Sequence, residues 1–139
     1  MRITLISTSN KQDKGPRIIA SFLEKNKHQV EILYSPEKPN CKDSGLIVVS
    51  ANVSTCKKAS KIIKALKKLN KPIVYAGIYP SLYPAEAIKE TDLVILKNPK
   101  ETILELANKL ENFQKISDIP NLWFKTSKKR ISQELKQIF

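Results

Sequence analysis

The chain has 139 residues, with 25 Lys and Arg against 13 Asp and Glu, which gives a formal net charge of +12. This length suits one domain with one sizeable core, and 41% hydrophobic with 27% charged residues excludes a disordered chain. No apolar run approaches the roughly 20 residues of a membrane span, and no signal-peptide pattern follows Met1, so we expect a cytoplasmic protein with no membrane partner.

The first half of the chain alternates strand and helix patterns. An apolar run over residues 3–7 predicts a strand, and apolar residues at helical spacing predict a helix over residues 15–27. Alternation over residues 29–33 and an unbroken apolar run over residues 46–49 predict two further strands. Unbroken apolar runs are typical of strands covered on both faces, as in a parallel sheet.

Residues 54–71 contain seven lysines and no acidic residue. Apolar residues recur within this segment at helical spacing and lysines occupy the opposite stripe, so it predicts an amphipathic helix with a basic outer face. Two interpretations stay open: a solvated surface, or a docking face for an acidic partner. A nucleic-acid partner is not expected, because no aromatic residues interleave with the lysines to stack on bases.

The second half repeats the alternation. Residues 73–76 and 93–96 are apolar and predict strands, residues 84–89 predict a short helical turn, and residues 99–112 predict a helix capped by Asn98. The whole pattern predicts an α/β fold, a flavodoxin-like (Rossmann-like) doubly wound parallel sheet of strand order 2-1-3-4-5 in a three-layer α/β/α arrangement. In such a sheet a ligand crevice opens at the carboxyl ends of the first, third and fourth strands.

The carboxyl-terminal tail departs from the alternation. We interpret residues 1–112 as the Rossmann domain and residues 113–139 as a connector toward a missing downstream domain. Residues 121–125 and 129–132 predict a two-strand ribbon, and the chain stops on apolar residues after it. A small terminal helix that packs on the sheet is the alternative.

Few residues of this chain suit metal binding or catalysis. Cys41 and Cys56 are too few for a disulfide framework or a thiolate metal cage, so we predict no metal ligand and no catalytic residue here. His28 precedes the second predicted strand and would lie at the sheet edge opposite the strand carboxyl ends. We therefore interpret His28 as a surface or packing residue.

Three polar loops with small residues follow the first, third and fourth predicted strands. Gly77 is one of three glycines in the chain, and its place at a strand end suggests a close approach to the backbone. Lys57 and Lys58 oppose the dipole at the start of the basic helix, and a bound anion would offset them. The candidate cofactor-binding residues of the three loops are Ser9, Asn10, Gln12, Gly15, Ser50, Asn52, Ser54, Ala76, Gly77, Tyr79 and Pro80.

The order and spacing of several segments carry a family resemblance. Arg2-Ile3-Thr4-Leu5-Ile6, Pro72-Ile73-Val74-Tyr75-Ala76-Gly77-Ile78-Tyr79-Pro80-Ser81, Glu101-Thr102-Ile103-Leu104-Glu105-Leu106 and Ile119-Pro120-Asn121-Leu122 follow one another along the chain. In this order they resemble the amino-terminal cobalamin-binding domain of radical S-adenosylmethionine enzymes. The resemblance implies a Rossmann-like domain that holds the nucleotide tail of cobalamin in the crevice and its corrin ring above the strand ends.

The resemblance also assigns positions to the candidate residues. Ser50-Ala51-Asn52 stands where the family has Ser-x-Leu, and Ala76-Gly77 stands where it has Gly-Gly. Asn10 through Gly15 falls where the wider cobalamin-binding fold carries Asp-x-His-x-x-Gly, with Gln12 in place of the histidine. An amide nitrogen is a poor cobalt ligand, so cobalamin without a protein histidine ligand is expected.

The radical chemistry of this family requires a Cys-x-x-x-Cys-x-x-Cys motif, which Cys41 and Cys56 cannot provide. The resemblance therefore places an iron-sulfur cluster and S-adenosylmethionine in a carboxyl-terminal catalytic domain of the same gene. It implies a cobalamin-carrying domain of a transferase, methyltransferase-like enzyme, not catalytic by itself. The alternative is a degenerate, cofactor-free sheet domain that serves as a basic docking module for a protein or a nucleic acid.

Overall fold

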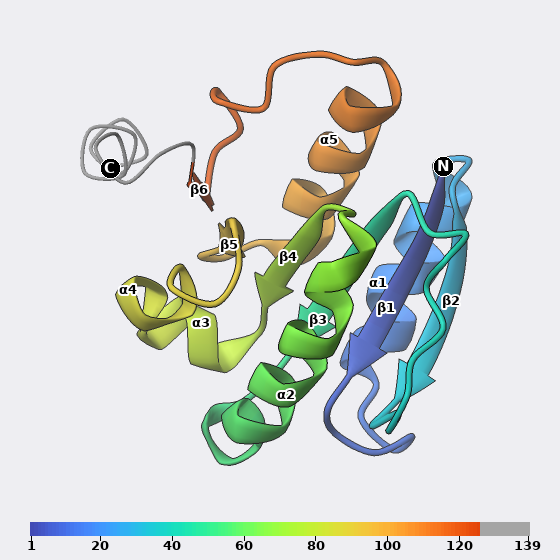
Figure 1. The fold of residues 1–139 in the computed structure, drawn as a ribbon. Coiled ribbons are helices and arrows are strands. Elements are labelled where there is room, and N and C mark those ends of the chain that lie inside the picture. The colour runs from blue at the N-terminus through green and yellow to red at the C-terminus, as the bar shows by residue number, and fades with distance from the viewer. Residues whose placement is uncertain (126–139) are drawn as a thin grey trace.

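The computed structural model describes residues 1–125, which form one six-stranded sheet with helices on both faces (Figure 1). The strands lie in the order β2-β1-β3-β4-β5-β6, and all neighbours from β2 to β5 are parallel. The α/β fold class and the order 2-1-3-4-5 are therefore confirmed. The strands are β1 (Arg2–Ser7), β2 (Gln29–Tyr34), β3 (Leu46–Ser50), β4 (Ile73–Ala76), β5 (Leu93–Ile95) and β6 (Leu122–Phe124).

The helices connect these strands. They are α1 (Gly15–Lys25), α2 (Cys56–Leu66), α3 (Ile78–Leu82), α4 (Pro84–Ala87) and α5 (Pro99–Glu111), with short 3-10 turns at Val53–Thr55 and Lys67–Leu69. Among the described residues, no helix has the length and hydrophobicity to cross a membrane.

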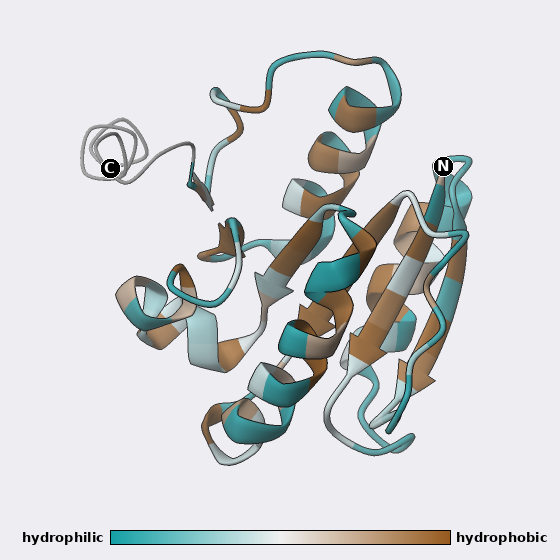
Figure 2. Cartoon of the chain, in the orientation of Figure 1, coloured by the Kyte–Doolittle hydropathy of each residue, from teal (hydrophilic) through white to brown (hydrophobic). Residues whose placement is uncertain are grey.

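The apolar runs of the sequence become the buried strands of this sheet. All of Leu46–Val49 in β3 is buried, and β4 is buried along its full length. Strand β2 lies at an edge and is only partly covered, which explains its alternating sequence. In Figure 2 the central strands are brown, whereas the outer sides of the helices carry most of the teal.

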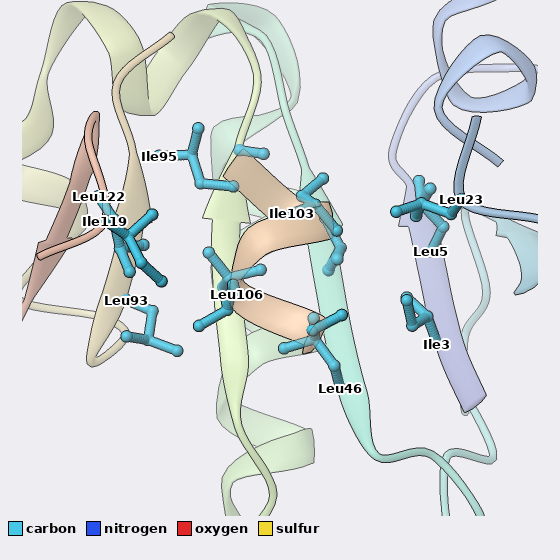
Figure 3. Packing of buried hydrophobic residues seen from close by; sticks show 14 of the residues in the cluster. Ile3, Leu5, Leu23, Leu46, Leu93, Ile95, Ile103, Leu106, Ile119 and Leu122 are labelled. Atoms are coloured by element: carbon cyan, nitrogen blue, oxygen red, sulfur yellow. The ribbon is translucent and has the colours of Figure 1, made fainter. Parts of the chain in front are cut away.

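Two hydrophobic clusters hold the layers together, one on each face of the sheet. The first joins β1 and β3 to α1 and α5 through Leu23, Ile103 and Leu106, which point toward the strands in Figure 3. The second packs Ile63 of α2 against Tyr75 of β4 on the opposite face. Burying each large aliphatic side chain contributes about 2 kcal/mol, so these clusters fix the positions of the loops at the strand ends.

The tail adds a strand that the sequence interpretation did not place in the sheet. The sequence predicts that residues 121–125 pair with 129–132. In the structure, β6 lies within the first of these segments and runs antiparallel along β5, with Val94 opposite Trp123. The reason is burial, because Leu122, Trp123 and Phe124 are all buried against the sheet. The ribbon partner over 129–132 lies outside the described residues, and the division of the chain at residue 112 stays a prediction.

Two local expectations also need correction. Residues 77–81 were expected to be a loop, but helix α3 begins at Ile78, with the Ser81 N–H donating to the Gly77 carbonyl. Asn98 does precede α5, yet its side chain makes no capping hydrogen bond, because its backbone has a left-handed conformation with φ of 53°.

The crossover from β2 to β3 contains no helix. Residues 35–45 form bends and a turn, anchored by the buried Cys41 and by a hydrogen bond between the Thr4 hydroxyl of β1 and the Ser44 hydroxyl. The other parallel connections between neighbouring strands each carry helical structure. On the face covered by α2, the layer beside that helix is therefore thin.

Candidate functional site

Three loops meet at the carboxyl ends of β1, β3 and β4. The Thr8 N–H and hydroxyl both donate to the Ser50 carbonyl oxygen, at 3.2 and 2.8 Å. The Ala51 N–H donates to the Ala76 carbonyl oxygen at 3.1 Å and ties the loop after β3 to the end of β4. The loops converge because the carboxyl ends of neighbouring parallel strands share one edge of the sheet.

The fold requires a glycine at position 77. Its φ is 105°, and a Cβ atom at this position would lie 2.6 Å from the Ala51 carbonyl oxygen. The close approach expected at Gly77 is therefore made by the neighbouring loop, and no ligand is needed to explain the glycine. Ser50 lies beside it, since its hydroxyl oxygen would be 3.1 Å from the same Cβ.

The loop after β1 is bonded mainly to itself. The Ser9 hydroxyl donates to the Asp13 carboxylate at 2.8 Å, and the Asn10 side-chain oxygen accepts from the Gln12 N–H at 3.0 Å. The Gly15 N–H donates to the Asp13 carboxylate at 3.0 Å. Asn10, Gln12 and Gly15 are exposed, so the Gln12 side chain is accessible at the position where the resemblance has histidine.

The loop after β3 contains a capping box. The Asn52 side-chain oxygen accepts from the Thr55 N–H at 3.0 Å and from the Ser54 hydroxyl at 2.7 Å. The Thr55 hydroxyl accepts from the Asn52 N–H at 3.0 Å. This box satisfies donors that a bound anion was expected to meet, although Lys57 and Lys58 remain exposed beside it.

The predicted residues after β4 lie at different depths. Ala76 and Pro80 are buried, so their side chains do not reach the surface, and Ala76 contributes its carbonyl oxygen to the link with Ala51. The Tyr79 ring lies between the rings of Tyr75 and Tyr83, with centroids 5.8 and 5.6 Å away. Tyr79 therefore packs toward the cluster beneath α2, and burial raises the pKa of its phenol.

An apolar hollow of about 320 Å³ lies beside α3, at the carboxyl ends of β4 and β5. Ile78 and Leu82 line it and are 62% and 61% exposed, which is unusual for large aliphatic side chains. Sequence reasoning missed both residues. Their spacing of four residues directly after Gly77 was the available signal, because it puts both on one side of a helix. The lining is Gly77, Ile78, Ser81, Leu82, Ile95, Lys97 and Pro99.

A second, polar hollow of about 460 Å³ lies at the ends of β1 and β2. Its lining residues are Thr8, Ser9, Asn10, Lys11, Tyr34, Ser35 and Lys58. The candidate residues are thus divided, with Ser9 and Asn10 in the polar hollow and Gly77 in the apolar one. Ser50 ends β3, and Asn52 lies in the loop that follows it, between the carboxyl ends of β1 and β4.

The titratable groups of the described chain include a buried thiol and a bridging histidine. Within residues 1–125, no group of three or more His, Cys, Asp and Glu side chains could hold a metal ion. Burial raises the pKa of the Cys41 thiol, which keeps it in its unreactive form. His28 lies at the opposite edge of the sheet, buried and bonded to the Met1 amino group and to Asn108, so of the two expected roles, surface or packing, it has the packing role.

Known proteins match this chain in structure but not in sequence. No family model and no curated protein matches the chain. Two solved structures of the radical S-adenosylmethionine methyltransferase TsrM from Kitasatospora setae match 91% of this chain with TM-scores of 0.78 and 0.75, at 17% and 18% identity. The first holds a tryptophan substrate and a S-adenosylmethionine analogue, and the second holds cobalamin and a 4Fe-4S cluster.

The cobalamin-dependent S-adenosylmethionine radical enzyme OxsB, solved with aqua-cobalamin bound, matches 91% of this chain with a TM-score of 0.71 and 14% identity. The chain spans 28%, 27% and 21% of the lengths of these three solved chains, so it corresponds to about a quarter of each. In fold, the chain is therefore similar to one part of cobalamin-dependent radical S-adenosylmethionine enzymes, as its sequence resemblance implies.

Proposed function

We propose that this chain is a cobalamin-carrying domain of a radical S-adenosylmethionine enzyme and that it is not catalytic by itself. The observation that carries the proposal is the convergence of the loops around Thr8, Ser50 and Gly77 at one edge of the sheet. Ligands of open α/β sheets bind at this edge. The solved structures of similar fold that hold cobalamin support the choice of ligand.

The residues at this edge fit cobalamin that has no protein ligand to cobalt. They offer hydroxyl and amide groups, whereas the histidine of the described chain lies at the other end of the sheet. Gln12 is exposed at the position of the expected ligand, and its amide binds cobalt poorly. We infer that Ser9, Asn10, Ser50, Asn52 and Ser54 supply polar contacts to the cofactor.

The apolar hollow at this edge of the sheet fits the macrocycle of cobalamin. Ile78 and Leu82 expose aliphatic surface beside a hollow that is mostly apolar. Exposed aliphatic side chains that gather at one place mark a binding surface, because water would otherwise cover them at a cost. We infer that these two residues exclude water from one side of the bound macrocycle, while Gly77 and Ala76 hold the loop backbone in place.

The proposed catalytic role belongs to the rest of the enzyme. Bound cobalamin would supply a redox-active cobalt centre for group transfer. The iron-sulfur cluster and S-adenosylmethionine would be held in a downstream domain of the same gene, since Cys41 and Cys56 do not form a cluster motif. A methyltransferase-like reaction and a cytoplasmic location are part of this proposal.

Corrinoid retention tests this function directly. The purified chain would be mixed with hydroxocobalamin, passed through gel filtration and examined by visible absorption. We expect the corrinoid band to elute with the protein and its spectrum to stay the same in a Gln12→Ala variant, because Gln12 does not ligate cobalt. A protein fraction free of corrinoid would reject the proposal.

A cofactor-free docking module is the second candidate. The observation that favours it is that Asn10 and Asn52 are already bonded within their own loops. In that case the corrinoid would elute separately from the protein in gel filtration. The protein would still bind an acidic macromolecule, and this binding would weaken as salt rises.

A further inference from the structure

The lysines of α2 have no acidic partners in the described structure. Among residues 1–125, the ion pairs join Met1 to Glu111, Arg2 to Asp43, Lys89 to Glu86, and Lys109 to Glu105 and Asp118. None of them includes a lysine of α2, and all four of these lysines are exposed. The outer side of this helix is largely teal in Figure 2. Its positive charge is left for solvent or for a partner.

The charged side of α2 borders a hollow, because the crossover beside this helix contains no helix of its own. A hollow of about 410 Å³ runs between α2 and the start of the 35–45 segment. Lys57 and Lys61, one helical turn apart, line it together with Lys58 and Glu37. A helix in the β2–β3 crossover would have occupied this layer, so the groove follows from the fold and not from side-chain positions alone.

The groove continues past the helix start. Ser35 and Lys58 line both this hollow and the polar hollow that reaches Lys11. At the junction the Ser35 hydroxyl, shared between the Thr8 and Ser9 carbonyl oxygens at 3.1 and 3.3 Å, ties the segment after β2 to the loop after β1. We call the two hollows together the basic groove. It carries four lysines, Lys11, Lys57, Lys58 and Lys61, against the single carboxylate of Glu37.

We propose that the basic groove is a docking site for an extended acidic polypeptide segment. Its excess of positive charge complements Asp and Glu side chains, and its two joined hollows are longer than one small anion would need. The exposed Asn10 and the half-buried Ser35 offer polar groups to a peptide backbone. Ser9 and Asn10 line the polar hollow and are also assigned to the cofactor, so the two ligands would share that end of the groove, whereas Lys57 and Lys61 are assigned to docking alone.

A polypeptide fits the groove better than a nucleic acid does. The lining includes one aromatic ring, that of Tyr34, and no arginine, whereas strand binding uses successive stacking rings and bidentate phosphate contacts. The Glu37 carboxylate repels any polyanion, but it can accept hydrogen bonds from the N–H groups of a peptide backbone, which a phosphate backbone lacks.

Fluorescence anisotropy with defined probes tests the docking site. The probes would be a labelled peptide of alternating glutamate and serine, an all-serine peptide of equal length, and a labelled single-stranded oligothymidine. We expect binding of the glutamate peptide at low salt that weakens as salt rises, with no binding of the serine peptide. Absence of binding to the glutamate peptide, or tighter binding of the oligothymidine, would overturn the proposal.

Two double variants with the same change in net charge separate the groove from bulk charge. Lys57→Glu with Lys61→Glu should weaken peptide binding about tenfold or more, whereas Lys27→Glu with Lys115→Glu, exposed and outside the groove, should weaken it less than about threefold. Equal losses in the two would show that net charge alone attracts the peptide. A single Lys61→Gln variant, with an expected loss of about threefold, keeps the test valid if a double variant unfolds. Corrinoid retention should be the same in all of these variants.

Discussion

The two ends of the sheet use their polar groups in opposite ways. At the amino ends of the strands, the buried His28 bridges elements, with one ring nitrogen 2.9 Å from the Met1 amino group and the other 2.7 Å from the Asn108 side chain in α5. At the carboxyl ends, Asn10 and Asn52 bond within their own loops and leave neighbouring side chains exposed. The His28 bridge stabilises the fold, whereas the exposed side chains beside the self-bonded asparagines can contact a ligand.

Gly77 is an exception at the carboxyl ends, because this position is required by the fold, and its substitution should have the greatest effect on stability. Gly77→Val should lower the free energy of unfolding by about 3 kcal/mol or more, since its Cβ would lie 2.6 Å from the Ala51 carbonyl oxygen at a φ of 105°. Chemical denaturation measures this. Gly15→Ala serves as the control and should change stability by less than about 1 kcal/mol, because its nearest neighbour is the movable Asp13 side chain. Equal effects of the two variants would show that the contact between residue 77 and the Ala51 carbonyl oxygen does not limit stability.

The next effect tests the amino ends. His28→Ala should cost about 2 kcal/mol of stability, because it leaves the Asn108 side chain and the Met1 amino group without their buried partner. Urea denaturation of this variant would be compared with that of Ser21→Ala, an exposed position on α1 where about 0.5 kcal/mol or less is expected. A His28 variant as stable as the Ser21 variant would show that this bridge does not stabilise the fold.

A smaller effect of opposite sign is expected near the carboxyl ends. Tyr75 is fully buried, and its hydroxyl has no hydrogen-bond partner within residues 1–125. Burial also raises the pKa of this phenol, so it stays neutral. Tyr75→Phe should therefore leave stability unchanged or raise it by about 1 kcal/mol, measured by thermal unfolding. A clear loss of stability would reveal a polar network beneath the loops and would weaken the contrast between the two ends.

The smallest effect depends on pH and belongs to the amino ends. A hydrogen bond with the Met1 amino group lowers the pKa of the exposed Glu111 carboxyl, so this pair stabilises the fold above the ordinary carboxyl pKa and loses its effect as pH falls through the lowered value. Glu111→Gln should therefore be slightly less stable than the parent near neutral pH and equal to it in acid. Unfolding curves across this range measure the difference, and a gap that widens in acid would contradict the assignment.

The sheet could be predicted from sequence because its signal is local. The unbroken apolar runs at Leu46–Val49 and in β4 became buried central strands, and the alternating run of β2 became an edge strand. The place of β6 beside β5 was not predicted, since it depends on burial of Trp123 and its neighbours against a distant strand. Helix α3 was expected as a loop because Pro80 and Gly77 are both typical of turns.

The candidate site was predicted in outline but not in its contacts. That the loops around Ser50 and Gly77 meet followed from strand order, which fixes the loops that share an edge. The burial of Ala76 and the capping role of Asn52 could not be predicted, because they depend on which of several competing local hydrogen bonds form. The exposure of Ile78 was missed for a similar reason, since an apolar residue after a strand is usually buried.

Corrinoid affinity in two matched variants shows whether the cofactor lies at the carboxyl ends of the strands. Ile78 beside the proposed site and Ile18 on α1 are 62% and 57% exposed, so replacing either with glutamate should cost the fold little. Titration with hydroxocobalamin, followed by visible absorption, should give about tenfold weaker binding for Ile78→Glu and parental binding for Ile18→Glu. Equal affinity in both variants and the parent chain would contradict a cofactor site at the carboxyl ends of the strands.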